Sequence, residues 1–353
     1  MQIRTISQPG FEEVITCYDA ESGLRSIIAI HSTKLGPALG GIRMLPYLDE
    51  KDALKDVMLL AKAMTYKAAV SHLKLGGGKA VILGDPLIRK TNALLKAMGK
   101  FVQHLKGRYI AAKDAGITMD DLVEISKETK YVTGLPGSMG GSGDPSPWTA
   151  LGILEGIRAC VKERLGKEQL EGLRIAIQGV GHVGYALAEL LYREKTNLVI
   201  SDTNPALAEL AASKFKAAAV SPDEIENADV DIFSPCALGG IINDQSIPRF
   251  KCSIIAGGAN NQLADEIKHD AALSKKGILY APDYIINAGG LINIYVRDIL
   301  KEKDANSWIK PIRPTLLEIF KKAKEEKTGT ARAANQFTEC LLQEPAGNLH
   351  PTP

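Results

Sequence analysis

The sequence predicts an α/β protein with two domains, and three observations lead to this class. Between residues 25 and 144, short apolar runs alternate with segments whose apolar residues recur at helical spacing. A segment rich in Gly, Pro and Ser over 134–147 interrupts this pattern and predicts a hinge. From residue 173 onward a second, more regular β/α alternation begins, which is typical of a doubly wound parallel sheet.

In the first half, apolar runs predict strands over 25–31, 79–83 and 108–112. Capping residues predict helix starts at Asp49, Thr91 and Thr118, the last with Asp121 in a pattern resembling a capping box. The helix after Asp49 gathers its apolar residues on one face: Ala53, Val57, Leu60, Ala61 and Met64. These elements define an expected N-terminal α/β domain over residues 1–140.

In the second half, Ser146 is expected to cap a helix that has Pro147 in its first turn. Strands are predicted over 173–177, 198–201, 231–234, 253–257 and 277–280, and helices near 291–300 and 314–324. The second domain is expected over 141–304. The C-terminal helices of 305–343 are expected to pack back on the first domain, and the tail 344–353 to be disordered.

Composition narrows the classes of function. The chain has 353 residues, of which 45% are hydrophobic and 24% charged, and a net charge of +2. This charge is too small to indicate binding to nucleic acid or to a membrane surface. The sequence has neither an apolar run long enough to span a bilayer nor an apolar core in its first ten residues, so no signal peptide is expected.

The cysteines indicate a reducing compartment, and we expect a cytoplasmic protein. Their number is odd, and none forms a C-x-x-C pair, which argues against a disulfide framework and a zinc knuckle. The histidines form no H-E-x-x-H or H-x-x-H cluster, so no metal site is expected. The five cysteines are Cys17, Cys160, Cys236, Cys252 and Cys340.

The most informative motif follows the predicted strand 173–177. It is a Gly-x-Gly-x-x-Gly turn, and Asp202 ends the next predicted strand. This layout predicts a Rossmann-type dinucleotide-binding domain, with the pyrophosphate at a helix N-terminus. A plain turn, or the same fold binding FAD or S-adenosylmethionine, is the alternative. The residues of the turn are Gly179, Val180, Gly181, His182, Val183 and Gly184.

Two further observations refine the expected ligand. Asp202 would accept hydrogen bonds from ribose hydroxyls, and the next residues carry no Arg or Lys for a 2′-phosphate, which favours NAD over NADP. Small and amide residues over 234–237 and 256–261 follow predicted strands, where ligands bind in open α/β sheets. Cys236 and Ala237 belong to the first of these segments.

Lysines and glycines suggest chemistry in the first domain. Lys67, Lys74 and Lys79 flank three consecutive glycines, and another glycine run lies at 36–41. A lysine buried beside other cations loses proton affinity and can act as a base, while a second lysine can bind a carboxylate. Asp114 is the natural group for moving a proton. The alternative is that these lysines are solvated surface charges.

These motifs together resemble the family of glutamate, leucine, valine and phenylalanine dehydrogenases, most closely its leucine/valine branch. The resemblance implies reversible NAD-dependent oxidative deamination of an L-amino acid to a 2-oxo acid and ammonia by a homo-oligomer. The segments that carry it are 35–44 (LGPALGGIRM), 64–69 (MTYKAA), 76–81 (GGGKAV), 143–149 (GDPSPWT), 178–184 (QGVGHVG), 236–243 (CALGGIIN), 256–263 (AGGANNQL) and 280–290 (YAPDYIINAGG).

The resemblance also implies roles for single residues. Lys79 corresponds to the base that activates water, and Asp114 to the group that moves a proton to and from the substrate nitrogen. Lys67 corresponds to the anchor of the substrate carboxylate, assisted by the backbone of Gly40 and Gly41. Further expected contacts are Met64 and Asn260 with the amino acid, and Thr149 and Asn287 with the nicotinamide carboxamide.

Four residues match the side-chain pocket of that family: Leu39, Ala112, Leu291 and Ile294. Their bulk favours a branched aliphatic substrate, although each could equally be ordinary core packing. An aromatic amino acid such as phenylalanine or tryptophan is the alternative, and a non-catalytic NAD-binding homologue is a third reading. Lys113, Ile117 and His182 depart from the family pattern.

Overall fold

The computed structural model describes residues 1–344, and the chain folds as two compact units. The first unit contains Met1–Asp144, Ile294–Glu302 and the segment that starts at Leu341. The second contains Pro145–Asn293 and Lys303–Cys340. Apart from Glu344, the tail that we expected to be disordered lies outside the described residues. None of the described helices combines the length and apolar character that a bilayer crossing requires.

The first unit is built on a mixed sheet of six strands in the order β1-β2-β3-β5-β4-β6. The pairs along β1, β2, β3 and β5 are antiparallel, whereas β4 lies between β5 and β6 and is parallel to both. The strands are β1 (Gln2–Ile6), β2 (Glu13–Asp19), β3 (Leu24–Ser32), β4 (Ala38–Leu45), β5 (Gly76–Leu83) and β6 (Tyr109–Lys113).

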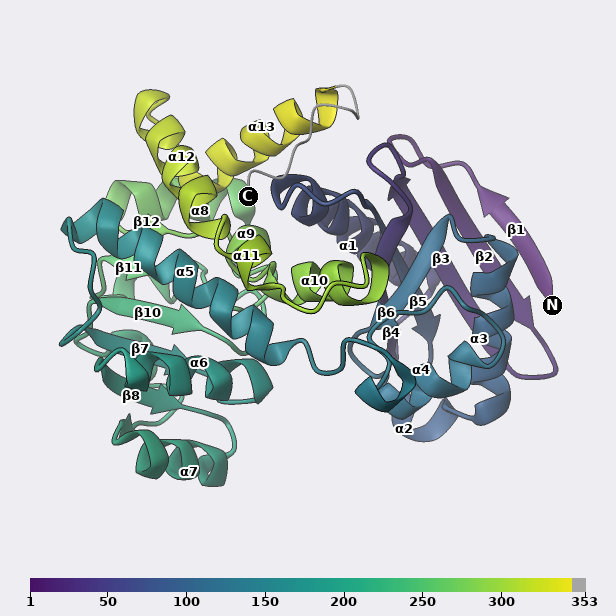
Figure 1. Ribbon diagram of the computed structural model, residues 1–353, viewed down its shortest axis with the longest axis horizontal. Coiled ribbons are helices and arrows are strands. Elements are labelled where there is room, and N and C mark those ends of the chain that lie inside the picture. The colour runs from purple at the N-terminus through teal and green to yellow at the C-terminus, as the bar shows by residue number, and fades with distance from the viewer. Residues whose placement is uncertain (345–353) are drawn as a thin grey trace. The chain divides into compact units, whose positions relative to one another are not determined.

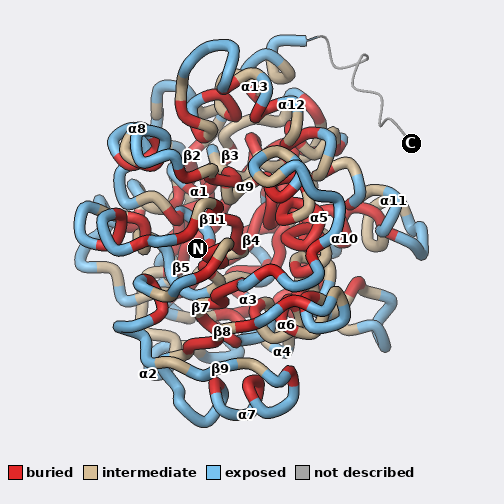
Figure 2. Tube along the Cα trace, turned by 90° about the vertical axis from the view of Figure 1, so that its left-hand side faces the viewer, coloured by how far each residue is buried: buried red, intermediate tan, exposed pale blue. Residues whose placement is uncertain are grey.

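Helices cover both faces of this sheet (Figure 1). Alternate residues of a strand point to opposite faces, so Ile27 packs towards α1 (Glu50–Val70) and Ile28 towards α3 (Asn92–His104) and α4 (Met119–Ser126). The short helix α2 (Pro86–Arg89) follows β5. The inner strands β3, β4 and β5 are mostly buried, as Figure 2 shows, whereas the edge strand β1 has no buried residue.

The predicted helix starts in this unit are confirmed. The side chain of Asp49 accepts a hydrogen bond from the Asp52 backbone N–H, and Thr91 caps α3 in the same way. Thr118 and Asp121 form a complete capping box on α4. Each side chain satisfies a backbone donor that the first helical turn leaves unpaired.

The strand β4 was not predicted, because its sequence ALGGIRML contains two glycines, which have low strand propensity. Close packing explains them. A Cβ atom on Gly40 would lie 1.7 Å from the carbonyl oxygen of Gly78 on β5. Only glycine fits there without a shift of the backbone. The antiparallel strands β1 and β2 were also not predicted.

The second unit contains six parallel strands in the order β12-β11-β10-β7-β8-β9, which is the Rossmann order. The order reverses between β7 and β10, and ligands bind at such a switch point. The elements are α5 (Ser146–Leu165), β7 (Arg174–Gln178), α6 (His182–Arg193), β8 (Asn197–Ser201), α7 (Pro205–Phe215), β9 (Ala218–Ala219), β10 (Ile232–Pro235), β11 (Ile254–Ile255), α8 (Glu266–Lys276) and β12 (Leu279–Tyr280).

The start of α5 differs from the prediction. Pro145 rather than Ser146 occupies the cap position, and Ser146 is the first helical residue. The backbone carbonyl of Pro145 accepts a hydrogen bond from the Thr149 N–H at 2.9 Å, so the backbone begins the helix without a side-chain cap.

The C-terminal helices differ from the expectation over residues 303–340, which pack within the second unit, whereas the end of the last helix, from Leu341, groups with the first unit as expected. The small residues of α5 explain the packing within the second unit. A Cβ on Gly152 would lie 3.0 Å from Ile312 Cδ1, so α12 (Ile312–Glu325) approaches α5 closely. The buried carboxylate of Asp270 accepts hydrogen bonds from the backbone N–H groups of Ala331 and Arg332, at the start of α13 (Thr330–Gln343).

A short return segment completes the first unit. After α9 (Asp283–Ile286) and α10 (Gly289–Ile294), the chain forms one π-helical stretch, Tyr295–Ile299. The carboxylate of Asp298 in this stretch accepts hydrogen bonds from the Gly134 N–H at 2.7 Å and from the Ser142 hydroxyl at 2.9 Å. Asp298 thus ties the return segment to the predicted hinge region.

Candidate active site

An ion pair between a buried lysine and a partly buried aspartate lies on the sheet of the first unit. Lys79 lies in β5, and Asp114 directly follows β6. The Nζ atom of Lys79 is 2.8 Å from Asp114 Oδ2, and the side chains are 8% and 22% exposed. The sequence placed both residues in the site, and the fold brings them together across β4. Lys79 is therefore not a solvated surface charge.

Neighbouring cations control the ionisation of Asp114. Burial alone would raise the pKa of this carboxyl, because burial disfavours the charged form. The charges of Lys79 and Arg43, with a hydrogen bond from the Ala115 backbone, outweigh burial and lower the pKa from 3.8 to about 2. Asp114 is therefore ionised at neutral pH.

Glycines bring the backbone of β4 close to this pair. A Cβ atom on Gly41 would lie 2.7 Å from the Asp114 Cβ and 2.8 Å from the Lys113 carbonyl oxygen. The fully buried Tyr109 donates a hydrogen bond from its hydroxyl to the Gly40 carbonyl oxygen at 2.6 Å. The conformation of the two-glycine segment is thereby fixed. Tyr109 was not among the predicted site residues.

The helix α1 supplies two of the predicted substrate contacts. Met64 and Lys67 are partly buried in its last two turns, and Lys67 lies in the last turn. The helix packs tightly on β5, since a Cβ on Gly77 would lie 2.0 Å from the Thr65 backbone nitrogen. This glycine therefore determines how closely the segment with Lys67 approaches the strand with Lys79.

The predicted pocket residues fall into both units. Leu39 on β4 and Ala112 on β6 are buried, and Ala112 is the register partner of Gly41. Ile294 belongs to the first unit, whereas Leu291 is buried in the second. The fold thus brings Leu39 and Ala112 onto neighbouring strands.

The glycine motif in the second unit forms the turn between β7 and α6. Gly179 has a φ angle of +92°, and a Cβ on Gly184 would lie 1.9 Å from the Gly179 carbonyl oxygen. Gly181 is the cap residue of α6, and no side chain caps this helix. A Cβ on Gly181 would meet nothing within 4 Å. The open, uncapped N-terminus therefore suits a pyrophosphate.

Asp202 is held beside this turn. Its Oδ2 atom accepts a hydrogen bond from the Val180 backbone N–H at 2.8 Å, and Oδ1 accepts one from the Asn204 N–H at 2.9 Å. His182 and Val183 begin α6, where His182 is exposed. The carboxylate thus lies next to the glycine turn, as the ribose interpretation requires.

The loop after β10 lies on the other side of the switch point. The Cys236 backbone N–H donates to the Gln178 carbonyl oxygen at 2.7 Å, and a Cβ on Gly179 would lie 2.8 Å from Ala237 Cβ. Cys236 and Ala237 therefore lie against the glycine turn. Burial raises the pKa of the Cys236 thiol, which keeps it protonated.

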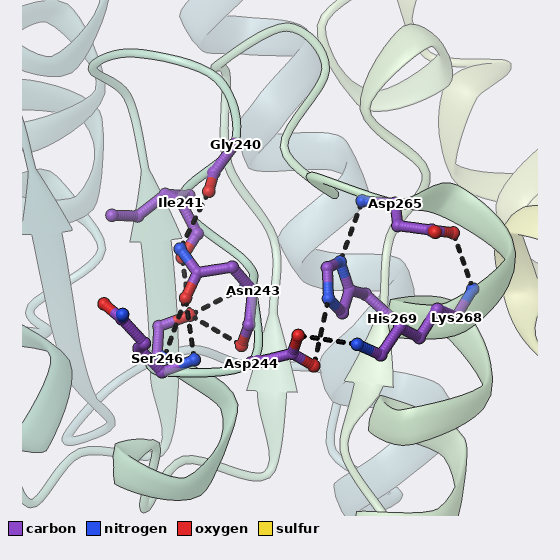
Figure 3. Close-up of polar contacts among 9 residues, drawn as sticks. Gly240, Ile241, Asn243, Asp244, Ser246, Asp265, Lys268 and His269 are labelled. Carbon is purple, nitrogen blue, oxygen red and sulfur yellow. Dashed lines mark hydrogen bonds and ion pairs between the residues drawn. The ribbon is translucent and has the colours of Figure 1, made fainter.

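Polar contacts hold the rest of this loop rigid (Figure 3). The Asn243 side chain donates to the Gly240 carbonyl oxygen at 3.0 Å and accepts from the Ser246 N–H at 3.0 Å. Asp244 forms an ion pair of 2.6 Å with Lys268 on α8. The Asn243 contacts thus join one part of the loop to another, and the ion pair of Asp244 binds the loop to α8, which indicates a structural role.

Three polar residues of the second unit were predicted to contact ligands. Asn260 lies in the loop after β11, Asn287 ends α9, and Thr149 lies near the start of α5. Asn287 donates from Nδ2 to Asn260 Oδ1 at 2.7 Å and to the Gly258 carbonyl oxygen at 3.2 Å. Its own Oδ1 atom is buried and has no hydrogen-bond partner among the described residues. Thr149 donates its hydroxyl to the Pro145 carbonyl oxygen at 3.1 Å. An orphaned buried acceptor of this kind fits the amide donor of a nicotinamide.

The parallel Rossmann sheet, the glycine turn and the acidic residue define a dinucleotide-binding domain, and the chain joins it to a unit that contains the Lys79–Asp114 pair. Comparison with known proteins specifies the class further. Residues 12–131 match the Glu/Leu/Phe/Val dehydrogenase dimerisation domain. Residues 203–340 match the Glutamate/Leucine/Phenylalanine/Valine dehydrogenase family. The chain belongs to this family of amino-acid dehydrogenases, whose chemistry requires a nicotinamide cofactor.

Similar proteins cover almost the whole chain. Leucine dehydrogenase of Thermoactinomyces intermedius is 47% identical over 93% of this chain and 90% of its own length. L-tryptophan dehydrogenase of Nostoc punctiforme is 48% identical over 95% of this chain and 94% of its own. The crystal structure of L-tryptophan dehydrogenase from Nostoc punctiforme superposes with a TM-score of 0.82, at 46% identity, over 94% of this chain and 96% of that one.

The lowered pKa of Asp114 predicts a change of stability with pH. A carboxyl whose pKa falls on folding stabilises the protein above its unfolded pKa, and this contribution is lost as the pH falls through the folded pKa. The shift from 3.8 to about 2 corresponds to about 2–3 kcal/mol, lost between about pH 4 and pH 2. Urea unfolding of the wild type and of Asp114→Asn at several pH values measures this. The variant should be less stable at neutral pH and lose less between pH 4 and pH 2; equal losses in both proteins would contradict the assignment.

The glycine turn predicts a contrast between two alanine variants. Gly184→Ala forces a Cβ to 1.9 Å from a carbonyl oxygen, so the backbone must shift, and we expect a loss of about 3 kcal/mol or more. A Cβ atom at Gly181 meets open space, so Gly181→Ala should lower the free energy of unfolding by only about 1 kcal/mol, because alanine is a poorer cap residue than glycine. Thermal unfolding of both variants measures the contrast. Equal losses would show that the close approach of Gly184 to Gly179 does not limit stability.

Proposed function

We propose that this protein catalyses reversible NAD-dependent oxidative deamination of branched aliphatic L-amino acids to 2-oxo acids and ammonia. The observation that carries the proposal is the buried contact of 2.8 Å between Lys79 and Asp114, beside the glycine strand β4. The leucine dehydrogenase of Thermoactinomyces intermedius, 47% identical, supports it. A lysine and a carboxylate in contact supply a base, once the lysine has lost its proton, and a proton acceptor for this reaction.

The first unit would bind the amino acid and move its protons. Lys67 and the backbone N–H groups of Gly40 and Gly41 bind the substrate carboxylate. Lys79, once deprotonated, removes a proton from water as the water oxygen bonds to the imino carbon, so Nζ gains that proton. Asp114 accepts a proton from the substrate nitrogen and returns it to the departing ammonia. Met64 contacts the bound amino acid from α1.

The second unit would bind the cofactor. A nicotinamide cofactor held there would supply the acceptor for the hydride that leaves the substrate Cα. The backbone N–H groups of Gly181, His182 and Val183, at the uncapped start of α6, hold the pyrophosphate, and Asp202 accepts from the ribose hydroxyls. Thr149 and the free acceptor of Asn287 orient the carboxamide. Cys236 and Ala237 contact the cofactor from the loop after β10.

The choice of NAD over NADP rests on Asp202. Its carboxylate is fixed by the backbone N–H groups of Val180 and Asn204, so it cannot turn away from a 2′-phosphate without losing both hydrogen bonds. A fixed negative charge repels a phosphate at this position. The residues that follow, Thr203-Asn204-Pro205, provide no positive charge.

The side-chain pocket supports an aliphatic substrate. Leu39 and Ala112 are 1% and 5% exposed. Neither residue has a polar side-chain group that could bind a carboxylate in the side chain of the substrate. Ile294, which belongs to the same unit, adds aliphatic bulk. One methylene changes transition-state binding by only about 1–3 kcal/mol, so leucine, isoleucine and valine should all react. Aromatic amino acids are the second candidate, because L-tryptophan dehydrogenase of Nostoc punctiforme is 48% identical.

Two broader parts of the proposal concern assembly and location. The match of residues 12–131 to a dimerisation domain supports a homo-oligomer. All five cysteines are free thiols, which suits a reducing compartment, and we place the protein in the cytoplasm. Its partners are then small molecules, without nucleic acid or membrane.

A panel of L-amino acids tests substrate and cofactor together. NADH and NADPH formation at alkaline pH is measured in parallel reactions. We expect turnover with leucine, isoleucine and valine in the presence of NAD, and kcat/KM lower by about tenfold or more for phenylalanine and tryptophan. Preference for aromatic substrates would overturn the pocket assignment, and preference for NADP would overturn the role of Asp202. No turnover with any amino acid, from folded protein that binds NADH, would contradict the proposed reaction.

Replacing the proposed base tests the mechanism. Lys79→Ala should lower kcat by about 10²–10⁴-fold, because a positioned acid or base contributes this much. Binding of NADH, followed by its fluorescence, should be retained, since Lys79 lies in the other unit. Lys100→Ala, which removes an exposed lysine of α3, serves as the control. Turnover of Lys79→Ala close to that of Lys100→Ala would exclude Lys79 as the base.

A further inference from the structure

Arg43 is a charged residue of the first unit that the proposed mechanism does not yet use. It lies on β4, two residues after Gly41, and its side chain is 19% exposed. Its Nε atom donates to Asp114 Oδ2 at 2.8 Å, which is the same oxygen that Lys79 contacts at 2.8 Å. One carboxylate oxygen therefore binds two cations.

The other edge of the same guanidinium binds a second carboxylate. Arg43 Nη1 lies 3.1 Å from Asp56 Oδ2 and 3.3 Å from Oδ1, and Asp56 is on α1. The Tyr47 hydroxyl donates to Asp56 Oδ2 at 2.6 Å. Burial and this hydrogen bond raise the pKa of Tyr47, so the hydroxyl keeps its proton and remains a donor. A chain of contacts thus runs from Tyr47 through Asp56 and Arg43 to Asp114.

The planar guanidinium makes this geometry specific. Arginine presents donors on separate edges in a fixed plane, whereas lysine offers one point charge. Because α1 holds one edge of Arg43 through Asp56, the other edge has a fixed direction towards Asp114. The same helix carries Lys67 in its last turn.

We infer that Arg43 is a positioning residue for the reaction: it holds Asp114 Oδ2 together with Lys79 and leaves Oδ1 as the oxygen that exchanges a proton with the substrate nitrogen. The inference rests on the proposed function. In the proton transfer, an N–H bond of the substrate breaks, its electron pair stays on nitrogen, and an O–H bond forms at Oδ1. Oδ2 already accepts hydrogen bonds from two cationic donors, which occupy its two lone pairs.

Kinetics of Arg43 variants test this role. Arg43→Gln should lower kcat for deamination by about 10²-fold, while KM for the amino acid changes by less than about threefold, because Arg43 acts through Asp114 and not on the substrate carboxylate. Arg43→Lys keeps the positive charge and should recover about tenfold of this loss. Equal rises of KM and losses of kcat, or no recovery in Arg43→Lys, would contradict the inference.

A matched control separates this role from general loss of an ion pair. Arg25 on β3 also pairs with a carboxylate of α1, Glu50, at 3.6 Å, but these side chains are 56% and 57% exposed. Arg25→Gln should keep wild-type kcat and KM. If Arg25→Gln lost as much kcat as Arg43→Gln, the effect would belong to the packing of α1 on the sheet.

A second measurement does not depend on activity. Thermal unfolding is recorded for the wild type, Arg43→Gln, Asp114→Asn and the double variant. The midpoint shift caused by Arg43→Gln should differ by about 2 °C or more in the Asp114→Asn background, because contacting charges are coupled. Additive shifts would overturn the inference whatever the activity. Absence of wild-type turnover on every amino acid would instead contradict the proposed function, and the unfolding cycle would still decide the coupling.

Discussion

The first unit depends on the neutralisation of charge inside a sheet. A lysine and an aspartate removed from water are strongly destabilising unless each has a partner. Here Asp114 has two cationic partners, and the second of them, Arg43, is itself paired with Asp56. The arrangement requires three parallel strands at close range, and the glycines of β4 permit that approach. The position of α1 matters for the same reason, since it supplies Asp56.

The glycine turn of the second unit contains glycines that are required for two different reasons. Gly184 is required by the protein itself, because the carbonyl oxygen of Gly179 occupies the space of a side chain. Gly181 faces open space, and no contact within the described chain demands it. The space next to an uncapped helix N-terminus is what a bound phosphate needs. Gly184 is thus needed for folding, whereas the space that a bound ligand requires explains Gly181.

Local signals in the sequence predicted those features that are decided locally. The caps of three helices and five strands of the Rossmann unit follow from short-range chemistry and from regular alternation, whereas the two-residue strand β9 was not predicted. The strand β4 did not, because its glycines serve a tertiary contact with β5 that no local pattern contains. Arg43 lies within the family motif 35–44, yet its role depends on Asp56 and Asp114, which are brought near it only by folding. The helices after residue 303 pack in the second unit because of small residues on α5, a match between surfaces far apart in sequence.

The hydrogen bonds of Asp298 determine when the first unit can be completed during synthesis. Gly134 and Ser142 emerge from the ribosome long before their acceptor, which lies more than 150 residues later in the chain. The intervening Rossmann unit must be translated in between. The second unit therefore has the chance to assemble most of its sheet while the first still lacks its last segment. A fragment that ends at the hinge would leave those two donors without their carboxylate, so the first unit is not a natural piece for separate expression.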